Sequence, residues 1–205
     1  MYVPSKFVID EDAAWEVVRD AGAGMLVLVT PAGLESVFVP VVVSEDRRTM
    51  TTHVARVNPW WRSVSNDAEV LALFVSASAY VSPSLYPSRD QSPGVVPTWN
   101  YVAAQVRGRV RLRDDAAWVL EQVRLQTARF EEHRNVPWRV EDSPSHYIDQ
   151  QLRAIVGLEI DVVSIEGKAK LSQNRPVIDH DSVRRDFTRG NWRERSVAER
   201  MRDIE

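Results

Sequence analysis

Apolar and polar residues alternate with a period of two in several parts of this chain, and this alternation restricts the fold more than any other feature. The longest alternating segment covers residues 100–113, where valines and a leucine alternate with Gln105 and four arginines. Successive side chains of a β-strand point to opposite faces, so the segment predicts a strand with one buried face and an arginine face turned to solvent. Similar segments occupy residues 25–30, 34–43, 49–55, 70–75, 79–82 and 155–165.

Short turns join most of these segments, and few helices separate them. Helical patterns are confined to residues 10–21, 114–133, 143–153 and the tail, which we expect to form one or two solvated helices. Six or seven strands with this connectivity favour an antiparallel barrel over a doubly wound sheet. The predicted fold class is therefore α+β and mainly β, with residues 1–178 as the barrel domain and residues 179–205 as a C-terminal helical tail. Residues 83–97 hold four prolines and predict a long surface loop.

Composition excludes several classes of protein. The 205 residues include no cysteine, which removes disulfides, thiolate nucleophiles and cysteine-ligated metals and fits a reducing cytoplasm. The longest apolar runs, residues 25–29 and 37–43, are far shorter than the roughly 20 residues of a membrane span. The formal net charge of −3 disfavours direct DNA binding, because phosphate neutralisation supplies most of the affinity of a DNA-binding protein. We expect a cytoplasmic protein that acts on a small molecule.

The common nucleotide, hydrolase and metal motifs are missing from the sequence. It has neither a Gly-x-Gly-x-x-Gly after a strand nor a Walker-type Gly-Lys-Ser/Thr, which argues against Rossmann and P-loop proteins. It also has no His-Glu-x-x-His, no Gly-x-Ser-x-Gly and no close group of histidine and aspartate ligands. We therefore predict no metal site.

Polar side chains gather where the strand 49–55 ends. Thr52, His53, Arg56 and Asn58 offer the hydrogen-bonding groups that a phosphate, a carboxylate or a flavin ring edge requires. His53 is the one histidine in such surroundings, and imidazole is the side chain best suited to proton transfer near neutral pH. The alternative is an ordinary strand end with an Asx turn and tryptophan packing.

Two further segments combine aromatic, amide and cationic groups. Residues 97–101 place Trp99 and Tyr101 where the long loop returns to the sheet, either as walls for a planar ligand or as a structural cover of the barrel end. Residues 167–175 follow the last strand and contain Lys168 and Lys170, two of the three lysines of the chain. Such a stretch suits a phosphate or an electron-rich ring. The alternative is a solvated turn.

Taken together and in this order, these segments resemble the PaiB family, whose members are often described as FMN-binding negative transcriptional regulators. The resemblance covers nearly the whole chain. It implies a split β-barrel of the flavin reductase and pyridoxamine-phosphate oxidase type, normally a homodimer with its ligand site at the subunit interface. The blocks that carry the resemblance are Met1-Tyr2-Val3-Pro4, His53-Val54-Ala55-Arg56-Val57-Asn58-Pro59, Ala79-Tyr80-Val81-Ser82-Pro83-Ser84, Pro97-Thr98-Trp99-Asn100-Tyr101, Ile155-Val156-Gly157-Leu158-Glu159-Ile160 and Lys170-Leu171-Ser172-Gln173-Asn174-Arg175.

The resemblance also implies a set of ligand contacts. Those assigned to FMN are Thr52, His53, Asn58, Trp61, Trp99, Asn100, Lys170, Ser172, Gln173 and Asn174. Those assigned to substrate are Phe38, Arg56, Tyr80, Tyr86 and Tyr101. The chain departs from the family pattern at four positions, with Phe38 and Ser78 in place of histidines, Thr52 in place of a glycine and Leu85 in place of a tryptophan. A glycine allows the backbone to approach a ligand closely, so Thr52 is a candidate obstruction of the FMN site.

Three functions remain open at this point. In the first, the protein binds FMN, as a reductase or a flavin-linked regulator. In the second, the FMN site is lost and the barrel is a cofactor-free enzyme of secondary metabolism. It would condense an aromatic amine or amino acid with a carbonyl compound in a Pictet–Spengler-type reaction, with His53 moving the proton and Arg56 binding the carboxylate. In the third, the protein is a non-catalytic, ligand-sensing regulator.

Overall fold

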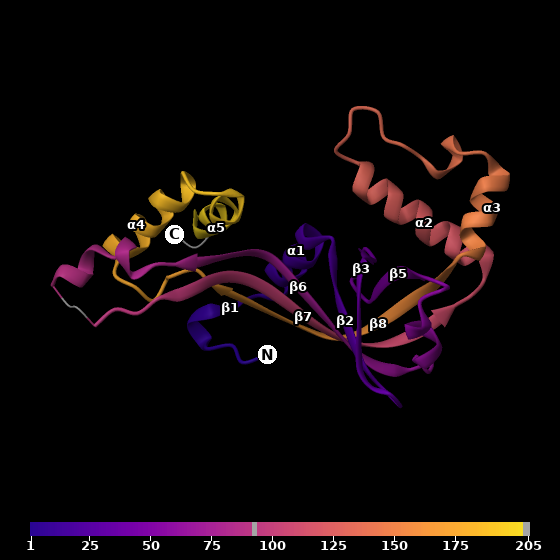
Figure 1. The fold of residues 1–205 in the computed structure, drawn as a ribbon, viewed down its shortest axis with the longest axis horizontal. Coiled ribbons are helices and arrows are strands. Elements are labelled where there is room, and N and C mark those ends of the chain that lie inside the picture. Colours follow the sequence, from indigo (N-terminus) through magenta and orange to yellow (C-terminus); the bar gives the residue numbers. More distant parts are fainter. Residues whose placement is uncertain (92–93, 203–205) are drawn as a thin grey trace. The chain divides into compact units, whose positions relative to one another are not determined.

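The computed structural model describes residues 1–91 and 94–202 (Figure 1). The fold is α+β and mainly β, as predicted. Its strands are β1 (Val8–Ile9), β2 (Ala23–Thr30), β3 (Gly33–Pro40), β4 (Val42–Val43), β5 (Thr49–Ala55), β6 (Ala68–Val81), β7 (Thr98–Arg113) and β8 (Ile155–Lys170). Its α-helices are α1 (Glu11–Ala21), α2 (Ala116–Glu131), α3 (Ser145–Arg153), α4 (Val177–Thr188) and α5 (Trp192–Arg202).

The strands of the described chain form one sheet in the order β3-β2-β6-β7-β8-β5-β4, and β1 pairs with β8. The pairings of β2 with β3 and β6, of β5 with β4 and β8, and of β1 with β8 are antiparallel. Internal contacts divide the chain into two compact units. The first comprises residues 1–21, 74–105 and 166–202, and the second comprises residues 22–73 and 106–165.

In the first unit, α1 and the two C-terminal helices supply much of the apolar core. Asp10 Oδ1 accepts from the amide of Ala13 at 2.8 Å, which caps the start of α1. The expectation of solvated tail helices is wrong, because α4 and α5 each bury an apolar face. The buried side chains of these three helices include Trp15, Val18, Val183, Phe187, Val197 and Met201.

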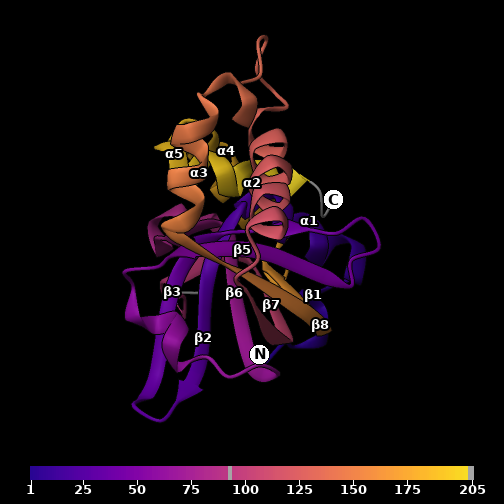
Figure 2. The same ribbon diagram turned by 90° about the vertical axis from the view of Figure 1, so that its right-hand side faces the viewer.

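In the second unit, β2 and β3 form a hairpin, and α2 packs near β5, with α3 beside α2 (Figure 2). The hairpin turns at Gly33, whose φ of +116° favours glycine. Gly157 of β8 allows the ring of Trp118 in α2 to approach the sheet, because a Cβ at residue 157 would lie 2.3 Å from that ring. Val119 and Gln122 are the buried residues of α2.

The structure corrects several expected boundaries. The segments 70–75 and 79–82 belong to one strand, β6, whose buried positions change at Ser76 from the even-numbered residues 70–74 to the odd-numbered residues 77–81. β8 extends to Lys170, so residues 167–170 are a strand end and not a turn after a strand. The expected loop contains two short helical turns, Pro83–Leu85 and Pro87–Asp90, and its residues 92–93 lie outside the described residues. Residues 203–205 of the expected tail also lie outside the described residues.

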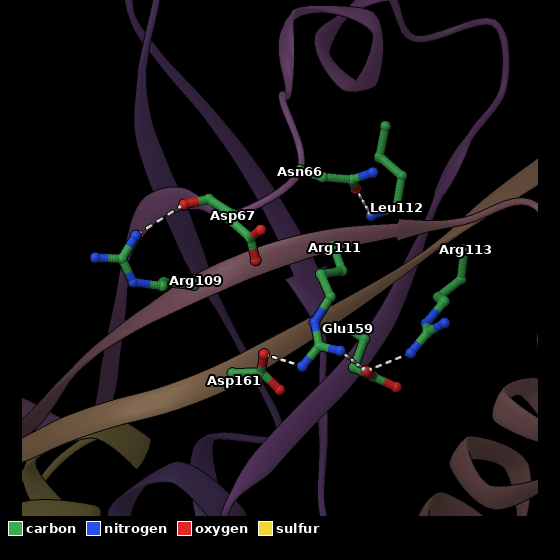
Figure 3. A network of polar contacts seen from close by, with 8 residues as sticks. All are labelled: Asn66, Asp67, Arg109, Arg111, Leu112, Arg113, Glu159 and Asp161. Carbon is green, nitrogen blue, oxygen red and sulfur yellow. Dashed lines mark hydrogen bonds and ion pairs between the residues drawn. The ribbon is translucent and has the colours of Figure 1, made fainter.

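The arginine face of β7 is solvated only in part. Arg107 and Arg109 are exposed, but Gln105 is buried and donates to Glu166 Oε2. Figure 3 shows Arg111 bonded to Asp161 and Arg113 bonded to Glu159, both of which are carboxylates of β8. Adjacent strands thus neutralise each other across this face.

Candidate functional site

The residues predicted to contact ligand fall into two groups, one in each unit. The second unit contains Phe38, Thr52, His53, Arg56, Asn58 and Trp61. The first unit contains Tyr80, Tyr86, Trp99, Asn100, Tyr101, Lys170, Ser172, Gln173 and Asn174.

Three polar residues around the end of β5 bond to the protein itself. The side chain of Thr52 is completely buried, and its hydroxyl donates to the carbonyl of Pro40 at 2.5 Å. Asn58 Oδ1 accepts from the amide of Trp60 and so caps the short helical turn Pro59–Ser63. Trp61 Nε1 donates to the carbonyl of Arg56 at 2.9 Å. Thr52 lies inside the protein, so its side chain does not project toward a surface ligand.

His53 is oriented by the helix that covers it. Its Nδ1 lies 2.9 Å from Gln122 Oε1, and Gln122 Nε2 in turn donates to Gln126 Oε1. Because an amide oxygen only accepts, this contact requires a proton on Nδ1. The sequence analysis did not identify Gln122. The available signal was its position three residues after Val119, which places both on the same face of the helix, and both are buried.

Arg56 is held by a carboxylate and two backbone carbonyls. Its Nη1 donates to Asp114 at 3.1 Å, its Nη2 also bonds to Asp114, and the carbonyls of Arg153 and Ile155 accept from Nε and Nη2. The hydrogen bond from Arg56 is the main cause that lowers the pKa of Asp114 below 3.8. A substrate carboxylate at Arg56 would therefore have to displace Asp114.

The amide and hydroxyl side chains of the first group lock the turn after β8. Asn100 and Ser172 are buried and bond to each other, and Ser172 adopts a left-handed backbone with φ of +66°. Gln173 Oε1 accepts from the amide of Leu171, and its Nε2 donates to the carbonyl of Ala169 at 2.6 Å. Asn174 is exposed. The side-chain amides of Asn100 and Gln173 thus stabilise the turn after β8.

Tyr86 belongs to the core of the first unit. Its ring is completely buried, and the guanidinium of Arg175 lies 4.5 Å from the ring centroid. Burial is the main cause that raises the pKa of Tyr86 above 10.0. Next to it, Ser88 donates to the buried carboxylate of Asp179 through both its amide and its hydroxyl, which anchors the start of α4.

Ring contacts and hydrogen bonds link aromatic residues of β6 and β7 with the lysines at the end of β8. We call this the aromatic–cationic face; its residues are Tyr80, Trp99, Tyr101, Lys168 and Lys170. The rings of Tyr80 and Trp99 lie 6.3 Å apart and are 51% and 46% exposed. Lys168 is nearly buried, and its Nζ lies 5.3 Å from the Tyr101 centroid and donates to the carbonyl of Tyr2.

Lys170 is the accessible cation of this face. Its Nζ donates to Thr98 Oγ1 and, at 2.9 Å, to the carbonyl of Trp99. An ammonium has three N–H donors, so the described contacts leave one for a ligand. Burial is the main cause that lowers the pKa of Lys170 below 10.5, and the charges of Lys168 and Arg175 add to the effect.

These residues fit the parts of a flavin mononucleotide. The exposed faces of Trp99 and Tyr80 suit a planar ring system, and the remaining N–H of Lys170 suits a phosphate or an electron-rich ring edge. Among the described residues no group of three histidines or carboxylates is arranged to hold a metal ion.

A second surface is apolar and was not predicted. Met25 of β2 lies opposite Phe38 of β3 and Leu73 of β6, and Val29 lies opposite Leu34. All five side chains are exposed, Phe38 to 66%, and a cavity of about 350 Å³ adjoins the face beside Val29 and Leu34. The continuous apolar run 25–29 was the signal, because a strand that is apolar on both faces needs cover on both.

Comparisons with known proteins identify relatives of this chain. Residues 1–164 match the model of a family described as "Putative FMN-binding domain". Protease synthase and sporulation protein PAI 2 of Bacillus subtilis (strain 168) is 31% identical over 188 residues, which cover 89% of this chain and 87% of that protein.

Solved structures share the fold. The conserved hypothetical protein Rv2991 from Mycobacterium tuberculosis matches with a TM-score of 0.61 and 12% identity, over 86% of this chain and 94% of that one. The FAD and heme binding protein from Mycobacterium smegmatis matches with a TM-score of 0.56 and 15% identity, over 89% and 79%. The fold is thus the split barrel of the flavin reductase and pyridoxamine-phosphate oxidase type, as the resemblance to the PaiB family implied. None of the helices in the described ranges has the length and apolar character to cross a bilayer.

Proposed function

The chain belongs to the family of FMN-binding domains just described, and we propose on that premise that it binds FMN at the aromatic–cationic face. Trp99 and Tyr80 would contact the isoalloxazine ring, and Lys170 would pair with the phosphate. The relatives support flavin binding in general; the choice of residues rests on this chain's own geometry.

One observation carries the proposal: Trp99 and Tyr80 present two exposed rings in mutual contact, and the ammonium of Lys170 bonds to the backbone carbonyl of Trp99 and to Thr98. Exposed tryptophan and tyrosine rings in mutual contact offer a stacking surface that the fold itself does not use. The ammonium of Lys170 is held in place by Thr98 and the Trp99 carbonyl, so it loses little freedom when a ligand binds.

Bound FMN supplies one- and two-electron redox chemistry, which a chain without cysteine does not provide by itself. The residues of this chain bind and orient the cofactor. A positive charge at Lys170 offsets the negative charge of the phosphate. The proposal leaves His53 outside the cofactor contacts, since it lies in the other group.

We also propose that the protein is a homodimer that pairs through the apolar face of β2, β3 and β6. Five exposed apolar side chains on three adjoining strands are more than a monomer usually leaves uncovered. A second copy offers the same apolar face, so a two-fold axis would cover both at once.

The direct test is the visible spectrum of the purified protein, followed by titration into FMN. The proposal expects either a yellow protein or quenching of FMN fluorescence that saturates at one FMN per chain. A colourless protein that leaves FMN fluorescence unchanged would contradict it and would favour the cofactor-free enzyme.

A further inference from the structure

A separate cavity of about 270 Å³ lies in the second unit, between the start of α2, the end of α3 and the start of β8. None of its residues belongs to the aromatic–cationic face. Its lining consists of Arg56, Asp114, Ala116, Val119, Asp149, Leu152, Arg153 and Ile155.

The ion pair of Arg56 and Asp114 forms a neutral part of this lining. Arg56 also donates to the carbonyls of Arg153 and Ile155, so its guanidinium is nearly saturated. The lowered pKa keeps Asp114 ionised at neutral pH. Because the two charges of the Arg56–Asp114 pair cancel, the pair favours neither an anionic nor a cationic ligand.

Two further charges of the cavity are unused. Asp149 and Arg153 lie four residues apart on α3, which places them on one face of the helix. Both are exposed, and within the described chain neither side chain has a hydrogen-bond or ion-pair partner. By contrast, Arg111 and Arg113 of the same unit are paired with carboxylates. An open carboxylate and an open guanidinium at one cavity suit a ligand that carries both charges.

The rest of the wall is aliphatic: Ala116, Val119, Leu152 and Ile155. At about 30 Å³ for each water molecule, the cavity holds about nine waters, which a ligand with a similar number of non-hydrogen atoms would replace. Valine and leucine have this size and an aliphatic side chain. An inorganic phosphate would meet two carboxylates, and a polyamine would meet two guanidinium groups.

We propose that this cavity binds a free aliphatic α-amino acid. Its ammonium pairs with Asp149, its carboxylate pairs with Arg153, and its side chain contacts Val119, Leu152 and Ile155. Electroneutrality follows, because the two ligand charges match the two open charges of the cavity. Binding at this site is independent of FMN.

Calorimetric titration with three ligands on the wild-type protein tests the proposal without any substitution. Leucine carries both charges, 4-methylpentanoate lacks the ammonium, and 3-methylbutylamine lacks the carboxylate. We expect leucine to bind saturably at millimolar concentration or below, and each analogue to bind about tenfold more weakly. Absence of leucine binding at millimolar concentration, or equal affinity for leucine and either analogue, would overturn the proposal.

Two variants then assign the charges. Asp149→Asn should weaken leucine and 3-methylbutylamine about tenfold but spare 4-methylpentanoate, and Arg153→Gln should weaken leucine and 4-methylpentanoate but spare the amine. Asp186→Asn and Arg185→Gln remove exposed charges on α4 and serve as matched controls with unchanged leucine affinity. Leucine affinity that is equal in all four variants would place the ligand elsewhere and refute this site.

Discussion

Asn100 and Ser172 are 72 residues apart and exchange two hydrogen bonds inside the first unit: Asn100 Nδ2 donates to Ser172 Oγ at 2.9 Å, and Ser172 Oγ donates to Asn100 Oδ1 at 3.1 Å. Both side chains are buried. This pair joins the two sequence blocks that most resemble the family pattern. It holds β7, which carries Trp99, against the turn that follows Lys170. The buried polar side chains of these two blocks therefore stabilise the fold.

The Asn100–Ser172 pair predicts coupled stability losses. Asn100→Ala should lower the free energy of unfolding by about 1–3 kcal/mol, because it leaves a buried hydroxyl with fewer partners. Ser172→Ala should have a smaller effect in the Asn100→Ala background than in the wild type. Urea denaturation of the four proteins measures the coupling, with the exposed Ser84→Ala as control. Strictly additive losses would contradict the pairing.

Close packing at Gly157 predicts a second stability effect. Gly157→Ala places a Cβ 2.3 Å from the Trp118 ring and 3.0 Å from the carbonyl of Arg113, so α2 has to shift away from the sheet. We expect a loss of about 1–3 kcal/mol in urea denaturation. Gly94→Ala is the matched control, because its Cβ would meet no atom within 4 Å. Equal stability of the two variants would show that Trp118 does not pack on Gly157.

Alternation along the sequence predicted most of the sheet, because a pleated strand with one buried face leaves a local signal. β5 was predicted to the residue at Thr49–Ala55. β6 was split in two, since Ser76 and Ser78 lack the β-branched or aromatic character of strand residues. The buried faces of α4 and α5 escaped notice, because their many charges concealed a narrow apolar side.

Candidate site residues were harder to sort, because a polar side chain looks the same in sequence whether it binds a ligand or the protein. Thr52 meets the carbonyl of Pro40, and Arg56 meets Asp114, 58 residues away. No local pattern reports such distant partners. The site assignments of Trp99, Tyr80 and Lys170 stay predictions, now supported by exposure and by available hydrogen-bonding capacity.

The lowered pKa of Lys170 predicts a pH dependence of FMN affinity. The ammonium form pairs with the phosphate, so affinity should fall as pH rises through the pKa of Lys170, which lies below 10.5. Lys170→Arg should hold its affinity over this range, because a guanidinium stays protonated. Lys170→Gln should bind FMN weakly at every pH. Fluorescence titrations from pH 7 to about 10 compare the three proteins, and parallel profiles would exclude Lys170 from the site.

The apolar face of the second unit predicts an assembly defect. Phe38→Glu should convert the dimer into monomers, because it places an unpaired charge on the face that a second copy would cover. Val136→Glu replaces a similarly exposed apolar residue away from that face and should remain dimeric. Analytical ultracentrifugation measures both. A monomeric wild type, or a dimeric Phe38→Glu, would contradict the proposed interface.

The central claim, that FMN binds beside Trp99, is tested most directly by fluorescence titration of FMN with wild type, Trp99→Ala and Trp192→Ala. Trp192 is an exposed tryptophan of α5 and provides the matched control. The structure predicts saturable quenching by wild type and Trp192→Ala, and an affinity about tenfold lower for Trp99→Ala, since the stacking surface is lost. Equal affinities of the two variants, or no quenching by the wild type, would contradict the claim.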